Sequence, residues 1–216
     1  MVTQKELVWI ALAGLLLRLV VGFATPIPAE DGVNYLWMAE RFAALDPRAA
    51  LSEVFPPLHP LLTAPWIALG LEPFRAGQLV AALAGVAILL PMRLVLGKVA
   101  PSASRVILWL VALAPLPVRF GAECYSEPVY LLVATCALAA ALADRWLLAG
   151  LCAGIAFWAR PEAVVIPIAC TLARRPAGSL TWLPFLGGVG MLSLARALLG
   201  LLADLVPPAE GRERLV

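Results

Sequence analysis

The stretch LVWIALAGLLLRLVVGFA, residues 7–24, decides the fold class of this chain. A helix needs about 20 apolar residues to cross a bilayer, and this stretch is close to that length. Its only charged residue is Arg18, near its C-terminal end. It exceeds the 7–15 apolar residues of a secretory signal, and no small-residue cleavage site follows it. We therefore expect a retained first span.

The whole chain shares this bias. It has 216 residues, of which 62% are hydrophobic and 14% charged, with a mean hydropathy of +0.93. A soluble domain is about 45–50% apolar and about 25% charged. The excess cannot be buried in one globular core, so the sequence predicts an all-α, polytopic transmembrane helical bundle.

About seven spans are expected, in a single module that covers residues 1–216. The stretches are 7–24, 78–96, 106–118, 128–143, 147–159, 163–172 and 180–202. The fifth and sixth are short enough to form one kinked hairpin, and residues 204–216 form a polar tail.

Residues 31–72 do not have the pattern of a membrane span. We expect them to form a long loop that carries interfacial helices. The segment from Asp31 to Leu45 places its apolar residues on one face and Glu40 and Arg41 opposite, which is typical of a helix lying in the membrane interface. The next segment, FPPLHPLLTAPWIALGL (55–71), holds four prolines, which argue against a straight spanning helix. We expect a broken, partly re-entrant or interfacial segment there.

Charge sets the expected orientation and excludes one class of partner. Lys and Arg divide equally between the two sides, but with a cytoplasmic N-terminus only Glu6 and Asp144 among the acids lie inside. We therefore expect loop 31–72 to face outward. The net charge is only +2 and no basic patch alternates with aromatic residues, so no nucleic-acid partner is expected.

Charged residues near the membrane are candidates for function. On this topology the outward side gathers the following residues: Glu30, Asp31, Arg119, Glu123, Glu127, Arg160 and Glu162. Tyr35 follows Asp31 by one helical turn and shares its face. Each has a structural alternative: acids cap helix N-termini, Arg160 and Glu162 can seal a helix break, and Arg18 can snorkel outward or pair with an acid. His59, between prolines, is more readily structural than a ligand.

Four stretches, in order, resemble the GT-C superfamily of integral-membrane glycosyltransferases, which includes protein mannosyltransferases, the lipid A aminoarabinose transferase and the GPI mannosyltransferases. The similarity covers residues 15–169 and lies in LLLRLVVG with EDGVNYLWMAERFA, FPPLHPLL, GAECYSEPVYLL, and LAGLCAGIAFWARPEAVVIPIA. The chain departs from the family in its shorter length, and in having Glu-Asp where many members have Asp-Glu or Asp-Asp.

The resemblance implies an inverting transfer of a sugar from a polyprenyl-phosphate donor to a hydroxyl of a lipid, glycan or protein acceptor. Asp31 matches the general base, with Glu30 as its substitute. The substrate-binding candidates are Tyr35, His59, Glu123 and Glu127, with Arg160, Arg119 and Arg18 for the phosphate. Asp31 and Glu123 could hold a divalent cation. The resemblance does not require one, since several branches of the family work without a metal.

Two alternatives stay open. The chain could be a non-catalytic module that binds polyprenyl lipid or a partner subunit, which would tolerate neutralisation of Asp31. It could also be a lipid or sugar transporter, but that class predicts internal repeats and helices broken at the midplane, whereas the charges here gather at one face. The resemblance places the protein in a membrane lipid environment, a bacterial inner membrane with the active site facing the periplasm or exterior.

Overall fold

The computed structural model describes residues 2–52, 55–173 and 177–205, and within these ranges every regular element is helical. The elements are α1 (Gln4–Ala24), α2 (Glu30–Ala43), α3 (Pro47–Ser52), α4 (Leu58–Ala68), α5 (Pro73–Ala87), α6 (Leu89–Val99), α7 (Ser104–Leu113), α8 (Pro115–Phe120), α9 (Glu127–Leu142), α10 (Trp146–Phe157), the 3₁₀ turn η1 (Pro161–Val164), α11 (Val165–Ala173), the 3₁₀ turn η2 (Ala177–Thr181) and α12 (Trp182–Leu205).

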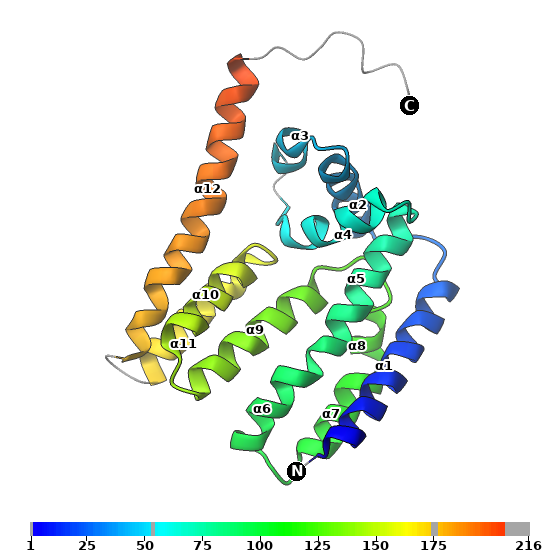
Figure 1. Cartoon of the computed structure of the whole chain (residues 1–216), viewed down its shortest axis with the longest axis vertical. Coiled ribbons are helices and arrows are strands. Elements are labelled where there is room, and N and C mark those ends of the chain that lie inside the picture. Colours follow the sequence, from blue (N-terminus) through cyan, green and yellow to red (C-terminus); the bar gives the residue numbers. More distant parts are fainter. Residues whose placement is uncertain (1, 53–54, 174–176, 206–216) are drawn as a thin grey trace.

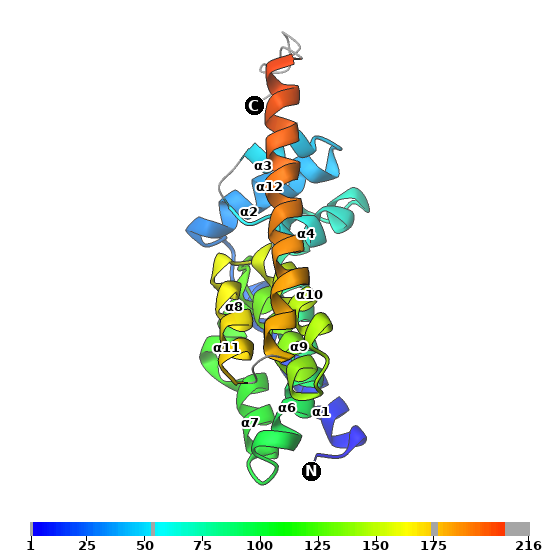
Figure 2. The same cartoon turned by 90° about the vertical axis from the view of Figure 1, so that its left-hand side faces the viewer.

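The longer helices form a bundle, and the three helices α2–α4 lie across the end of it that is remote from the N-terminus (Figure 1). We call this end the α2–α4 end. Helix α12 runs along one flank of the bundle and extends past α10 towards α3, as both views show (Figure 2). The chain thus has a helical body with a cap of short helices at one end.

Three helical stretches in the described part of the chain are long and apolar enough to cross a membrane: Gln4–Ala24, Pro73–Val99 and Ser179–Leu198. They confirm the first, second and seventh predicted spans as helices of spanning length. The other four stretches are helical but shorter, at 9–16 residues in α7, α9, α10 and α11. Pro115 follows α7 and Pro161 follows α10, so these helices end where proline removes a backbone donor. Seven full-length spans are therefore not confirmed.

The cap contains the predicted interfacial helix, now α2, and a helix in the proline-rich segment. Helix α4 forms because Pro57 precedes it and Pro60 lies in its first turn, where the backbone N–H has no helical partner to lose. Pro65 is tolerated inside it. At 11 residues α4 is too short to span, as the prolines predicted. The predicted polar tail begins inside α12, and residues 206–216 lie outside the described residues.

Arg18 is the largest fully buried side chain in the described part of the chain, and the residue is 1% exposed. Its Nη1 donates to the carbonyls of Gly14 (3.0 Å) and Ala112 (2.7 Å), and its Nη2 donates to Val111 (3.1 Å). The side chain therefore neither snorkels outward nor pairs with an acid among the described residues, contrary to both expectations. Backbone carbonyls of α1 and α7 solvate the guanidinium instead.

Glycines make the space for this side chain. A β-carbon at Gly121 would lie 2.5 Å from Arg18 Nε, and one at Gly85 would lie 2.9 Å from the same atom. At Gly14 the added carbon would be 3.1 Å from Nη1. Arg18 is therefore packed against α1, α5 and the end of α8 at glycine positions. A side chain at any of these positions would collide with the guanidinium group. On the other flank, α10 and α12 pack backbone against backbone, because a β-carbon at Gly188 would lie 2.8 Å from Gly154 Cα.

We predict that Gly121→Ala destabilises the fold by about 1–3 kcal/mol, the usual cost of overpacking a core. The side chain of Arg18 cannot retreat without losing its carbonyl bonds. The matched control is Gly187→Ala in α12, where an added carbon meets nothing within 4 Å, so stability should hold or rise slightly. The free energy of unfolding in detergent micelles measures both, and equal stabilities would refute this packing.

Candidate functional site

Helix α2 brings three of the predicted site residues to the α2–α4 end. Asp31 and Glu30 lie exposed in its first turn, and Tyr35, one turn later, is 6% exposed. The phenol of Tyr35 donates a hydrogen bond of 3.1 Å to Ser126 Oγ, next to the start of α9. The predicted register of Asp31 and Tyr35 on one helix is therefore present, with Tyr35 turned inward and Asp31 towards the surface.

Arg160 lies at the break between α10 and η1. Because Pro161 disfavours helical backbone in the preceding residue, Arg160 is extended, with φ −155° and ψ 132°. Two further bonds anchor the break: the N–H of Leu58 donates to the Trp158 carbonyl (2.8 Å), and Trp158 Nε1 donates to the Gly188 carbonyl (2.8 Å). The arginine is thus presented from a fixed backbone between α4 and α12.

The guanidinium of Arg160 joins two of the predicted acids. Its Nη1 is 2.6 Å from Glu127 Oε1, and its Nη2 is 3.1 Å from Glu162 Oε1. The hydrogen bond that Arg160 donates to Glu162 and the charge of Glu127 raise the pKa of Arg160 despite its partial burial, so it stays a cation at every accessible pH. The local pairing of Arg160 with Glu162 is present, and Glu127 from α9 extends it into a network.

The charges of this network meet around Tyr35. Burial raises the pKa of its phenol most, and the Ser126 hydrogen bond lowers it. The charge of Glu127 raises that pKa, Arg160 lowers it, and Asp31 raises it. Asp31, Glu127 and Arg160 therefore all influence the same phenol, and its direct polar contact is Ser126, the neighbour in sequence of Glu127. Their roles in binding or catalysis stay predictions.

A second ion pair borders this cluster. Arg119 Nε lies 3.2 Å from Glu123 Oε1, with the arginine side chain 67% exposed and the carboxylate 12% exposed. Glu123 precedes α9, whereas Glu127 is its first residue, so the two acids do not share a helix face. Tyr125 connects the two groups: Glu123, Arg119, Glu127 and Asp31 all act on the pKa of its phenol, which burial raises.

Two candidates stand apart from the network. Arg18 is bound to backbone carbonyls inside the helical body. Glu30 makes no ion pair among the described residues. Within that same part of the chain, no three His, Cys, Asp or Glu side chains come together as a metal site would require. The divalent cation suggested for Asp31 and Glu123 therefore has no third ligand of these types in the described ranges.

His59 lies fully buried in α4 beneath Tyr35, with ring centroids 5.6 Å apart. Burial lowers the pKa of its imidazole to about 4, and the nearby backbone of Gly77 offsets this only in part. Neither ring nitrogen makes a hydrogen bond of normal geometry within the described ranges. The ring is therefore neutral near pH 7, and it packs against Tyr35 without contributing positive charge to a phosphate site.

Two contributors were not foreseen from the sequence. Ser126 stands within the quoted GAECYSEPVYLL stretch, but nothing in its spacing indicates a bond to a residue 91 positions earlier. Trp158, which anchors the break, is a typical apolar residue of its helix by pattern. No protein-family model, curated protein or solved structure matched the chain.

Acid should destabilise the fold through His59. Between pH 6.5 and about 4 the unfolded chain takes up a proton at this imidazole that the buried ring does not, so this share of the stability is complete above pH 6.5 and lost as the pH falls. A shift of this size predicts a loss of about 2 kcal/mol between pH 7 and pH 4.5. His59→Leu removes the titration, so its stability should fall less over the same range.

Melting temperatures of both forms in detergent at pH 7 and pH 4.5 measure this difference. Titration of the carboxylates is common to the two proteins and cancels. Parallel loss of stability in wild type and His59→Leu would show that the imidazole is not held neutral by the fold.

Proposed function

We propose that the protein is an inverting glycosyltransferase that moves a sugar from a polyprenyl-phosphate donor to a hydroxyl acceptor. The observation that carries the proposal is a series of contacts at the α2–α4 end of a bundle of apolar helices. Tyr35, one turn after Asp31, bonds Ser126, and the next residue, Glu127, pairs with Arg160. Three of the sequence stretches that resemble the GT-C superfamily supply these residues: one carries Asp31 and Tyr35, one carries Glu127, and one carries Arg160.

In the proposed reaction the acceptor oxygen attacks the anomeric carbon on the face opposite the phosphate. The new carbon–oxygen bond forms as the bond to the phosphate oxygen breaks, which inverts the configuration. The proton of the acceptor hydroxyl goes to the Asp31 carboxylate, and the polyprenyl phosphate leaves as a stable anion that needs no general acid. A general base contributes about 10²–10⁴-fold to such a step.

Asp31 suits the role of base because it is exposed and free of any ion pair in the described part of the chain, so its carboxylate is available to a hydroxyl group. Glu127 and Glu162 are less suitable, because each already accepts from Arg160. Only one oxygen of each is bonded in this way, so the other oxygens can orient hydroxyl groups of the sugar or acceptor.

Arg160 is the proposed phosphate ligand. A guanidinium has five N–H donors in a rigid fork that matches phosphate, and the two carboxylates occupy one donor on each of Nη1 and Nη2. The remaining donors can bind phosphate while the carboxylates hold the side chain in place. The proposed setting is a membrane whose outer face, periplasmic in a bacterium, meets the α2–α4 end.

Turnover by an Asp31→Asn variant tests this proposal. The purified chain in nanodiscs is given a panel of radiolabelled polyprenyl-phosphate sugars together with candidate hydroxyl acceptors. We expect wild type to transfer one sugar, and the variant to lose at least a hundredfold in rate while still binding donor. Glu40→Gln is the matched control, an exposed acid on the same helix, and should keep wild-type rates.

Two outcomes would count against the proposal. If Asp31→Asn and Glu40→Gln are equally active, the base is another residue. If wild type turns over none of the donors yet binds one of them, the chain is a binding module and not a self-sufficient enzyme.

A further inference from the structure

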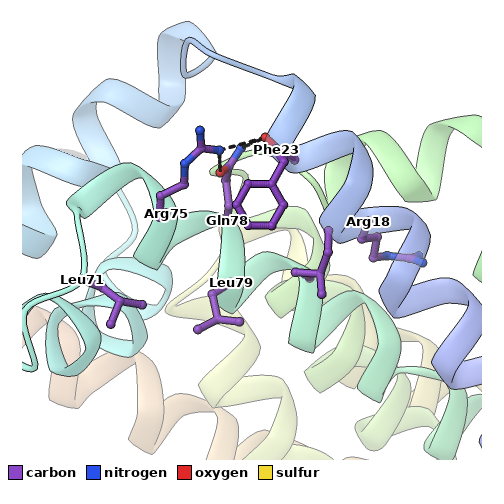
Figure 3. A pocket seen from close by; sticks show the side chains of 9 residues that line it. Arg18, Phe23, Leu71, Arg75, Gln78 and Leu79 are labelled. Carbon is purple, nitrogen blue, oxygen red and sulfur yellow. Dashed lines mark hydrogen bonds between the residues drawn. The ribbon is translucent and has the colours of Figure 1, made fainter.

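A groove between α1 and α5 lies apart from the charged network around Tyr35. It has a volume of about 190 Å³. Its walls are almost entirely apolar and include Leu19, Phe23 and Leu79, with Arg75 and Gln78 at one end (Figure 3). The aromatic ring of Phe23 is 74% exposed. Arg18 also lines the groove, but its guanidinium is already bonded to backbone carbonyls inside the helical body. An exposed apolar groove whose available polar groups lie at one end suits an amphipathic ligand.

The polar end of the groove is rigid. Gln78 is 6% exposed, and its Nε2 donates to the carbonyls of Gly22 and Ala122, both at 2.9 Å. Its Oε1 accepts from Arg75 Nη1 at 2.7 Å, and the same Nη1 donates to Gly22 at 3.0 Å. Every one of these groups is fixed without a ligand, so little conformational entropy would be lost when one binds.

The positive charge of Arg75 has no carboxylate partner within ion-pair distance in the described ranges. Glu72 is near in sequence, but its two oxygens accept from the backbone N–H groups of Phe74 and Arg75. The guanidinium lies 5.4 Å from the Phe23 ring centroid and 5.6 Å from that of Phe74. Capping the carbonyl of Gly22 at the end of α1 uses Nη1 alone, so Nε and Nη2 remain without a hydrogen bond in the described structure.

The groove also lies near the ends of two helical stretches of spanning length. Its α1 residues begin at Arg18, and the helix ends at Ala24, six residues later, which is about 9 Å at 1.5 Å per residue. Its other wall is the first turns of the spanning stretch Pro73–Val99. In a bilayer crossed by these two stretches, Arg75 would therefore lie near the membrane surface, with the apolar walls of the groove continuing from it towards the hydrocarbon.

We propose that this groove binds one anionic phospholipid, with its phosphate on Arg75 and part of one acyl chain against Leu19, Phe23 and Leu79. The volume supports a lipid, because small-molecule sites usually enclose about 300–1,000 Å³, whereas a lipid chain needs only partial enclosure and continues into the bilayer. Charge supports an anionic lipid, since a zwitterionic headgroup carries its own cation beside the phosphate. Arg is the side chain best matched to phosphate.

Native mass spectrometry of the purified full chain tests this site. The protein in detergent is titrated with palmitoyl-oleoyl phosphatidylglycerol, with the phosphatidylcholine of the same chains, and with glycerol phosphate. We expect the first phosphatidylglycerol to bind at least tenfold more tightly than phosphatidylcholine, and glycerol phosphate not to compete at the same concentration. Arg75→Gln should reduce the phosphatidylglycerol affinity to that of phosphatidylcholine.

Two further variants isolate the groove. Arg93→Gln removes the same charge near the other end of the same spanning stretch, where Arg93 bonds Gln4, and should leave the preference intact. Leu79→Trp fills the groove and keeps Arg75, so it should lower lipid affinity at least fivefold even if Arg75→Gln proves unstable. The proposal is overturned if phosphatidylcholine binds as tightly to wild type, if Leu79→Trp binds normally, or if glycerol phosphate competes equally.

Discussion

A guanidinium buried among apolar helices is the constraint on which the packing of this protein depends. Removing a cation from water is costly unless other groups solvate it. Arg18 meets this requirement with the carbonyls of Gly14, Val111 and Ala112, which belong to α1 and α7. Its Nε has no hydrogen-bond partner in the described structure, so the compensation comes from Nη1 and Nη2 alone. The helices around it can therefore shift little without exposing the guanidinium or breaking its hydrogen bonds to these carbonyls.

This constraint carries through to the α2–α4 end. Fixing α1 against α7 fixes the position of Gly22, whose carbonyl receives Gln78 from α5 and Arg75 from the same helix. The end of α1 then determines where α2 begins, and with it the positions of Asp31 and Tyr35. From the other side, the break at Arg160 is anchored by Trp158 to α4 and α12. The charged network thus forms between two independently fixed elements.

Local features of this arrangement follow from the sequence. Hydropathy predicts the three helices of spanning length, and the spacing of Asp31 and Tyr35 predicts their common helix. The expected helix break at residues 160–162 is present, where Pro161 keeps the backbone of Arg160 extended. Each depends on residues close together in the chain. The four middle stretches are also predicted as helices and are helical, but at 9–16 residues they are not confirmed as full spans, because apolar composition does not show how early a helix ends.

Contacts between distant segments could not be predicted. Arg18 donates to carbonyls 93 and 94 residues away, in a space that depends on Gly85 and Gly121. Every residue has a backbone carbonyl, so the sequence does not indicate which ones will accept from Arg18. The same applies to the Tyr35–Ser126 bond. The unpaired charge of Arg75 was also invisible, because the sequence places Glu72 three residues away while the structure uses that carboxylate to cap α5.

The central claim is that the network around Tyr35 recognises a polyprenyl phosphate. The most direct measurement is the affinity of sugar-free polyprenyl monophosphate for the chain in phosphatidylcholine nanodiscs, for wild type, Arg160→Gln and Arg93→Gln. We predict that Arg160→Gln weakens binding at least tenfold, and that Arg93→Gln, which removes a charge bonded to Gln4 outside the network, leaves it within twofold. Equal affinity of wild type and Arg160→Gln would contradict the account, because the phosphate would then be bound elsewhere or not at all.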